Sequence, residues 1–446
     1  MEQPKIYNNE AELINWLKYD LEEQRKNIAN EKCILLEKVK EEDLTLNIGR
    51  TDFIFGCDYI IINFDFIFDN IVSSIYGNII EDIYFKINCN GLIFNKYVSF
   101  SRFNLKIPTR ENEYIFHNSV DISFSTFQSS VNLSRTIFYK DVDFTYTDFE
   151  KETDLSSNYF YKIVNFKNVK FFDKTYFIFT SFSNILDLSN IKIKENLDLS
   201  TIEITNYTKI LFDGMVFDNE KIILSIGNDN ILKINKLSFK NIFINGIINI
   251  QNVEVETADF KGSVINRGLV NPVNFKIDNF ANRESALFLK NEAYARRNVI
   301  DALKYKDKEM EMHRKELLNK PNKTSKDWFD IISISLSSLY SNNGQNWGKS
   351  LFMTILITFV FFNIFYLPDL SQSNIEPYFY KDYFSNLIKY FIPTDYEQIK
   401  YYADASIGIN IFIKIFGAII YFAGKIMFWY GSVQTVQAFR KFSKGA

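Results

Sequence analysis

The sequence predicts a β-solenoid followed by two membrane-spanning helices. The first observation behind this prediction is an eleven-residue repeat that fills residues 120–207 with eight consecutive units and no insertion. The second is a pair of long apolar stretches in the C-terminal third, residues 351–367 and 407–439, separated by a more polar segment. The third is that the chain shows no clustered catalytic motif. Together these observations indicate a structural repeat joined to a membrane module.

The repeat units read VDISFSTFQSS, VNLSRTIFYKD, VDFTYTDFEKE, TDLSSNYFYKI, VNFKNVKFFDK, TYFIFTSFSNI, LDLSNIKIKEN and LDLSTIEITNY. The third position is always Ile, Leu or Phe, and the eighth is Phe in six units and Ile in the last two. An apolar residue at every fifth or sixth position favours a coil whose short extended faces each turn one side chain inward, with coils stacked about 4.8 Å apart. A helix would scatter these positions around its surface. The expected core residues are Ile122, Phe127, Leu133, Phe138, Phe144, Phe149, Leu155, Phe160, Phe166 and Phe171.

The small and polar residues that flank each apolar centre, as in DLS, DFT and NFK, resemble those of the pentapeptide-repeat family. The resemblance implies a right-handed quadrilateral β-helix with four faces in each coil. This chain has eleven residues for each pair of faces where the family's simplest form has ten, so we expect coils of about 22 residues with one looser corner. A β-sandwich with short strands is the alternative.

The regions around the repeat predict caps and a linker. We expect a helical cap over residues 1–45, the solenoid over 46–268 and a charged helical linker over 280–320. Residues 326–341 form an amphipathic pattern that begins with Trp and precedes an apolar stretch, which is typical of an interfacial helix. Its apolar face would lie in the membrane surface; burial against the solenoid is the alternative.

Residues 349–446 predict a module of two transmembrane helices. The second apolar stretch contains Lys414 and Lys425, which are eleven residues apart and therefore share one helical face. A charge inside a span usually faces protein or water, although Lys414 could also snorkel to the interface. The loop 368–406 carries six acids and three lysines, whereas basic residues follow the second span. Both termini should therefore be cytoplasmic. The resemblance to bacterial pentapeptide-repeat proteins implies that the membrane is a bacterial inner membrane.

The segments YKDKEM, YFIPTD and VQTVQAFRKF resemble those of bacterial membrane-bound pentapeptide-repeat proteins, in which an ion-channel-like module of two spans follows the repeats. Relatives with a complete potassium-channel module carry a T-x-G-[YF]-G filter. The corresponding loop here reads IPTDYEQ and lacks it.

We therefore expect an integral membrane protein whose cytosolic solenoid senses or binds a protein ligand. The module of two spans would oligomerise into an ion-conducting or membrane-permeabilising pore, by analogy a bacterial stress or anti-phage defence effector. Several subunits are needed, because two helices cannot enclose a water-filled path. The alternative is a non-conducting, membrane-tethered scaffold that binds proteins. The pore-lining candidates are Asn363, Lys414, Lys425, Gln434 and Gln437. The outer-mouth candidates are Pro393, Thr394, Asp395 and Glu397.

Composition argues against other classes of protein. The net charge of −3 is unlike that of a nucleic-acid binder. Residues 120–207 hold 12 acids and 9 bases, a weak excess for a DNA mimic. The three cysteines form no CxxC pair and the two histidines are far apart, so we expect reduced thiols, no metal and no cofactor. Residues 344–350, GQNWGKS, have three residues between the glycines where a phosphate loop needs four. We expect no enzyme.

Overall fold

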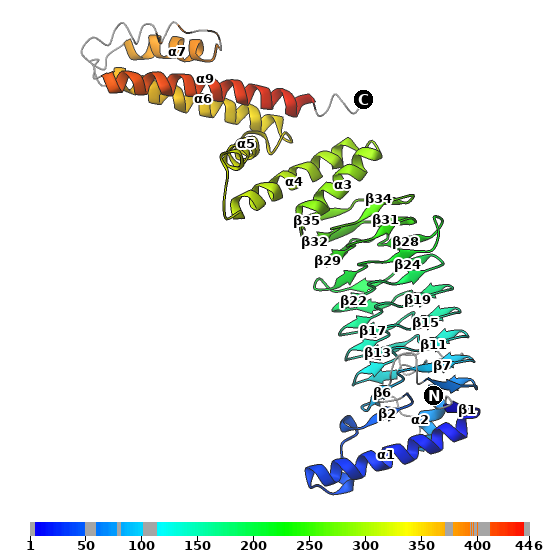
Figure 1. Cartoon of the computed structure of the whole chain (residues 1–446). Helices are drawn as coiled ribbons and strands as arrows, with labels where there is room; N and C mark the ends of the chain where they lie inside the picture. The colour runs from blue at the N-terminus through cyan, green and yellow to red at the C-terminus, as the bar shows by residue number, and fades with distance from the viewer. Residues whose placement is uncertain are drawn as a thin grey trace. The chain divides into compact units, whose positions relative to one another are not determined.

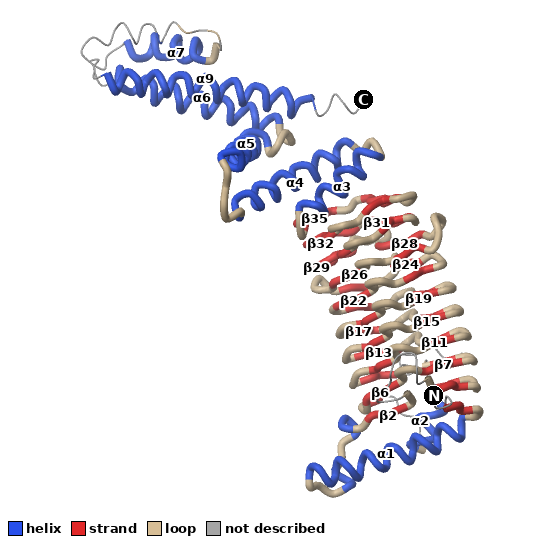
Figure 2. The backbone as a smooth tube through the Cα atoms, viewed as in Figure 1, coloured by secondary structure: helices blue, strands red, loops and turns tan. Residues whose placement is uncertain are grey.

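The computed structural model describes residues 5–49, 59–77, 82–100, 114–370, 378–392, 394, 396, 399 and 411–440. The chain divides into two compact units, Met1–Phe288 and Leu289–Ala446. The first unit consists of short parallel strands stacked in long sheets, with helices at both ends (Figures 1 and 2). The predicted solenoid-like parallel β fold is confirmed in this unit.

Four long sheets and one short sheet make up the stack. The first contains β1 (Lys5–Tyr7), β3 (Ile60–Ile62), β7 (Leu92–Phe94), β11 (Thr126–Phe127), β15 (Asp148–Phe149), β19 (Lys170–Phe171), β23 (Lys192–Ile193) and β27 (Val216–Phe217). The second contains β2 (Thr45–Asn47), β6 (Lys86–Asn88), β10 (Val120–Asp121), β14 (Val142–Asp143), β18 (Val164–Asn165), β22 (Ile185–Asp187), β26 (Lys209–Leu211), β29 (Leu232–Ser238), β32 (Val253–Asp259) and β35 (Lys276–Phe280).

The third sheet contains β4 (Phe66–Ile67), β8 (Val98–Ser99), β12 (Val131–Asn132), β16 (Thr153–Asp154), β20 (Thr175–Tyr176), β24 (Leu197–Leu199), β28 (Ile223–Ile226), β31 (Ile247–Gln251) and β34 (Leu269–Val273). The fourth contains β5 (Asp82–Ile83), β9 (Tyr114–Phe116), β13 (Thr136–Phe138), β17 (Tyr159–Phe160), β21 (Ser181–Phe182) and β25 (Glu203–Ile204). The short sheet pairs β30 (Phe243–Ile244) with β33 (Val264–Ile265).

The register shows why two repeat units make one coil. Val120 pairs with Val142, and Val142 pairs with Val164, so in this part of the repeat each strand residue lies beside the one 22 positions further on. The two strands of one unit and the two strands of the next belong to four different sheets. Residues at the same position of alternate repeats therefore stack on one another along the solenoid.

Two kinds of corner join the strands, and they explain the period of eleven. In the first corner the amide of Thr147 donates to the carbonyl of Phe144 at 3.0 Å, which closes a β-turn. The residue before Thr147, Tyr146, is left-handed with φ 59°. The core residues Phe144 and Phe149 are five positions apart across this turn, whereas Phe149 and Leu155 are six apart across the next corner. The added residue therefore lies in the second corner.

Side chains point inward at four positions of each unit. The ten core residues expected from the third and eighth positions are all buried, with at most 3% of their surface exposed. The first position is buried as well, as at Val131 and Val142. So is the sixth, where the hydroxyl Oγ1 of Thr147 donates to the carbonyl of Ile122 at 2.8 Å. A hydroxyl that bonds to the coil below can be buried without an unsatisfied polar group.

Helices cover the two ends of the strand stack. Helix α1 (Glu10–Lys32) lies along the N-terminal end in Figure 1 and buries Leu13, Leu17 and Leu21. Short helical segments follow at η1 (Leu36–Lys38), η2 (Glu41–Asp43) and α2 (Phe68–Tyr76). At the other end, α3 (Arg283–Ala295) begins, and its Phe288 stacks on Phe260 with ring centroids 5.3 Å apart. These helices cover apolar surface that the terminal coils would otherwise expose.

The second unit is helical. It contains the end of α3, then α4 (Val299–Asn319), α5 (Ser325–Ser341), α6 (Trp347–Leu370), α7 (Tyr378–Tyr390) and α9 (Ile411–Arg440). Helices α6 and α9 run antiparallel, since the ring of Trp347 packs on Phe439 and that of Phe365 packs on Tyr421. By length and composition, Trp347–Phe365 and Ile415–Arg440 could each cross a membrane.

Candidate functional site

Lys425 lies near the middle of α9, and only 3% of its surface is exposed. Its Nζ donates to the backbone carbonyl oxygens of Tyr390 at 2.7 Å and Ile392 at 2.8 Å. The same nitrogen lies 4.8 Å from the ring centroid of Tyr390 and 5.4 Å from that of Tyr421. Burying an ammonium group is costly unless its protons are satisfied. These carbonyl groups and ring faces compensate for the burial of Lys425.

The carbonyl of Tyr390 is that of the last residue of α7, and the carbonyl of Ile392 belongs to the turn that follows the helix. The last carbonyls of a helix have no partner within the helix and form the negative end of its dipole. A lysine is the favoured kind of side chain at such an end. Lys425 and the end of α7 therefore satisfy each other.

The chain reverses direction beside α9 after α7. Phe391 packs edge-on against Phe428, with ring centroids 5.9 Å apart. The ring centroid of Tyr396 then lies 6.4 Å from that of Phe422. Phe422 is six residues before Phe428, which is about 9 Å closer to the start of α9. In Figure 1, α7 lies beside the N-terminal half of α9. Helix α7 thus runs along the α6–α9 hairpin to its middle, and the chain then turns back.

Helix α9 packs closely against α5, α6 and α7 because two glycines lie on one of its faces. A Cβ atom added at Gly424 would collide with Tyr390 and Phe361, and one added at Gly431 would collide with Thr354 and Tyr340. Small residues at this spacing allow helices to pack closely. The two glycines, one of them next to Lys425, were the sequence signal that could have indicated this packing.

Asn363 and Gln434 also bind neighbours within the chain. Asn363 is half-buried: its Nδ2 donates to the carbonyl of Phe359 at 2.7 Å, and its Oδ1 accepts from Oη of Tyr383 at 2.8 Å. Gln434 is buried, and its Oε1 accepts from Oγ of Ser341 at 2.9 Å. In the single chain these two polar groups therefore hold α7 to α6 and α5 to α9.

The other predicted site residues are placed differently. Gln437 is exposed on α9, and Thr394 is exposed beyond α7. The side chain of Lys414 and the residues Pro393, Asp395 and Glu397 lie outside the described part of the chain. The structure thus joins Lys425 to the end of α7, a contact that sequence reasoning missed, because its two partners are separated by 35 residues and depend on the position of α7.

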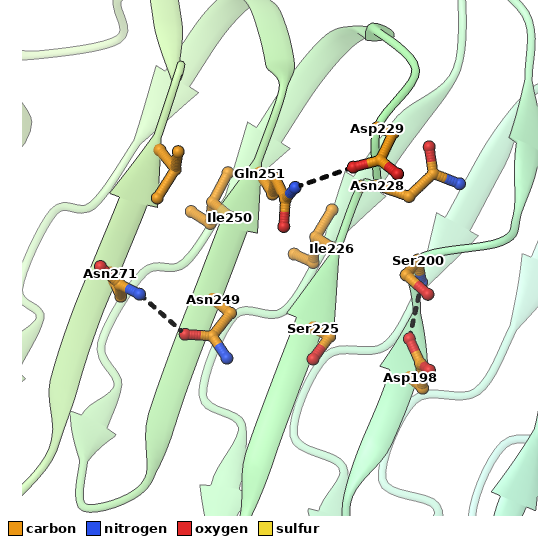
Figure 3. A pocket seen from close by; sticks show the side chains of 12 residues that line it. Asp198, Ser200, Ser225, Ile226, Asn228, Asp229, Asn249, Ile250, Gln251 and Asn271 are labelled. Atoms are coloured by element: carbon orange, nitrogen blue, oxygen red, sulfur yellow. Dashed lines mark hydrogen bonds between the residues drawn. The ribbon is translucent and has the colours of Figure 1, made fainter.

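The solenoid carries a polar hollow of about 380 Å³ on its third sheet, across β24, β28, β31 and β34 (Figure 3). Its floor is a ladder in which Asp198, Ser225, Asn249 and Asn271 are partners in adjacent strands. Nδ2 of Asn271 donates to Oδ1 of Asn249 at 3.3 Å. This surface presents amide and carboxylate side chains at the spacing of the strands. Such groups suit a binding partner whose surface carries polar hydrogen-bonding groups.

A ridge of stacked rings runs along a different part of the solenoid. The rings of Tyr84 and His117 have centroids 4.4 Å apart, those of His117 and Tyr139 5.1 Å, and those of Tyr139 and Tyr161 4.9 Å. Since the ring faces stack on each other, the ridge presents mainly ring edges and hydroxyls to solvent. Tyrosine is common in protein interfaces. The ridge is therefore a second candidate binding surface.

In the described part of the chain, no group of three or more His, Cys, Asp or Glu residues could hold a metal ion. The chain matches no family model, no curated protein and no solved structure in the comparisons made with each. The contact between Lys425 and the end of α7 is the most specific feature of the helical unit.

Proposed function

We propose that the chain is an integral protein of a bacterial inner membrane, with both termini cytoplasmic. The α6–α9 hairpin crosses the bilayer, and α7 re-enters it. Support comes from the apolar side chains that the hairpin leaves exposed, such as Phe352 at 63% and Ile426 at 67%. A soluble protein rarely exposes so much contiguous apolar surface. Further exposed apolar residues on the two helices are Ile355, Phe359, Val360, Ile415, Phe416, Ile419, Trp429, Val433 and Val436.

The proposed function rests mainly on the contact between Lys425 and the end of α7. Lys425 is 14 residues from Ile411, about 21 Å along α9 and therefore near the middle of the span. Irregular backbone is tolerated at that depth only where protein or a water-filled cavity satisfies it. A simple anchor has no use for such an element. We infer that it belongs to an ion-conducting or membrane-permeabilising pore built from several copies of the chain.

In this proposal, Lys425 acts through α7 and not by direct contact with ions. Its side chain is buried within one chain, so its role is to position the re-entrant helix. Gln437, exposed on α9, remains a lining candidate. Thr394 was expected at the outer mouth, but it lies two residues beyond Ile392, whose carbonyl binds Lys425, so in this proposal it stands near the middle of the membrane. Asn363 and Gln434 bind neighbours within the single chain, so in this proposal they hold the helices together.

The solenoid is proposed as the sensing part, a right-handed quadrilateral β-helix of the pentapeptide-repeat kind. Four long sheets and a 22-residue register support this assignment. The role of a stress or anti-phage defence effector is part of the proposal by analogy with membrane-bound relatives. The alternative is a non-conducting scaffold, which the tyrosine ridge and the polar hollow favour. A scaffold would tolerate an unrelated membrane anchor in place of its spans, whereas a pore would not.

Planar-bilayer recording of the purified chain tests the pore. We expect the wild type to conduct, and Lys425→Met to change the single-channel conductance or the open probability at least tenfold. The reason is that the carbonyls of Tyr390, at the end of α7, and Ile392, in the turn after it, lose a charged donor. Each such hydrogen bond is worth about 1.5–3 kcal/mol.

Ile426→Met is the matched control, because it introduces the same side chain at the adjacent, exposed position. It should conduct like the wild type. Absence of current from the wild type in every oligomeric state would contradict the proposal. So would a Lys425→Met variant whose currents are indistinguishable from those of the wild type.

A further inference from the structure

Helix α5 leaves an apolar stripe uncovered. Its Ile331 and Ile334 pack into a cluster with Leu317 of α4. On the other side, Trp328 and Phe329 are 52% and 70% exposed. Two more exposed residues, Ile332 and Leu339, continue the stripe at helical spacing. The helix thus buries one apolar face in protein and presents a second one outward.

The contacts of α5 set its direction relative to the hairpin. Oη of Tyr340 donates to the carbonyl of Met427 at 3.2 Å, and Ser341 bonds to Gln434, so the C-terminal end of α5 is attached to α9. In Figure 1, α5 is seen nearly end-on, whereas α6 and α9 are seen from the side. Helix α5 therefore crosses the hairpin. With the hairpin across a bilayer, α5 runs along the bilayer surface.

Basic side chains flank the start of the stripe. Lys320 pairs with Asp327 at 2.7 Å. Lys326 is exposed, and Lys323 lies with its Nζ 5.8 Å from the ring centroid of Trp328. The lysines thus stand at the same end of α5 as its two exposed aromatic residues. Apolar residues that enter a membrane surface beside lysines are the pattern of a helix that binds anionic lipid.

We propose that α5 docks on anionic phospholipid, with Lys323 and Lys326 binding the headgroups while Trp328 and Phe329 enter the acyl boundary. This inference rests on the proposed membrane insertion of α6 and α9. Each lysine near an anionic membrane surface strengthens binding to that surface roughly fivefold. Anionic lipid is therefore enriched around the first turns of α5.

Tryptophan quenching in vesicles tests this inference with the full chain. The reporter keeps Trp328 alone, with Trp16, Trp347 and Trp429 replaced by Phe. Vesicles contain equal amounts of phosphatidylcholine and phosphatidylglycerol, and only one of the two lipids carries brominated acyl chains. We expect Trp328 to be quenched at least fivefold more efficiently when phosphatidylglycerol is brominated. Lys323→Gln with Lys326→Gln should abolish the difference.

Two controls separate the inference from the function on which it rests. Lys140→Gln with Lys162→Gln, both on the solenoid, should leave the difference unchanged. A second reporter keeps only Trp429, which is exposed on α9. Equal quenching of Trp328 by the two lipids overturns the inference. Quenching of Trp429 without quenching of Trp328 also overturns it but leaves the proposed insertion intact. Quenching of neither overturns both.

Discussion

The inward-facing phenylalanines stack on one another from coil to coil. Phe144 and Phe166 have ring centroids 4.7 Å apart and an angle of 1° between their planes. Phe127 and Phe149 repeat this arrangement at 5.0 Å and 2°. The strand spacing sets this distance, so a flat ring at each core position fills the coil and meets the ring below. These residues determine shape and stability and perform no chemistry.

Removing one such ring should destabilise the solenoid. We expect Phe144→Ala to lower its free energy of unfolding by about 3–5 kcal/mol, because the cavity cannot collapse between two rigid neighbours. Phe144→Asp should prevent folding, since it buries an unpaired charge. Hydrogen–deuterium exchange across residues 140–170 measures both effects. Tyr207→Ala, at a side chain that is 79% exposed, is the control and should change stability by less than about 0.5 kcal/mol. Unchanged exchange in Phe144→Asp would contradict the core assignment.

Sequence reasoning reached some residues and missed others for physical reasons. The third and eighth positions are apolar in every unit, so periodicity alone predicts them. Thr147 escaped notice because a threonine is usually solvated, and only its bond to the carbonyl of Ile122 allows it to be buried. Lys425 was singled out as a polar residue in an apolar stretch. Its contact with α7 depends on packing that no local pattern encodes.

Among the helices, α5 has the most clearly defined start. Thr324 and Asp327 form a capping box, in which the side-chain oxygen of each accepts from the backbone amide of the other. The carboxylate of Asp327 also pairs with Lys320 at 2.7 Å. The pKa of Asp327 is lowered to about 2, mainly by the hydrogen bond from Lys320 and to a smaller extent by the hydrogen bonds from Thr324. The sequence predicted the helix from its amphipathic pattern but not the ion pair that fixes its start.

The lowered pKa of Asp327 makes the first turn of α5 sensitive to acid. A carboxyl group whose pKa is lowered by folding stabilises the folded state above its ordinary pKa of 3.8 and loses that contribution as the pH falls toward 2. We expect hydrogen-exchange protection of residues 325–331, corrected for intrinsic rates, to be constant above about pH 5 and to fall between about pH 4 and 2. Asp327→Asn should remove this dependence, whereas Asp330→Asn on the same helix should keep it. A flat wild-type profile would contradict the assignment.

At the scale of the whole molecule, the sequence predicted the repeat better than its ends. Strand β1 lies before α1 yet pairs with β3, so residues assigned to a helical cap also contribute a strand. Three residues are too few to show a period. The repeat itself could be recognised because the same positions point inward in all eight repeats, and two of them, the third and the eighth, are apolar in every repeat. The helical unit has no repeat, so its re-entrant segment could be recognised only from its contacts.

In the proposed assembly, several copies of this chain surround a pore to which each contributes a re-entrant α7 helix. The mass of the purified particle in lipid nanodiscs, measured under the conditions of the bilayer recordings, tests it most directly. One chain has a mass of 52.5 kDa. We predict that the protein mass is an integral multiple of this value, and at least twice it. A single-chain mass that persists at every protein concentration would contradict the proposed assembly, because one hairpin with one re-entrant helix cannot enclose a water-filled path.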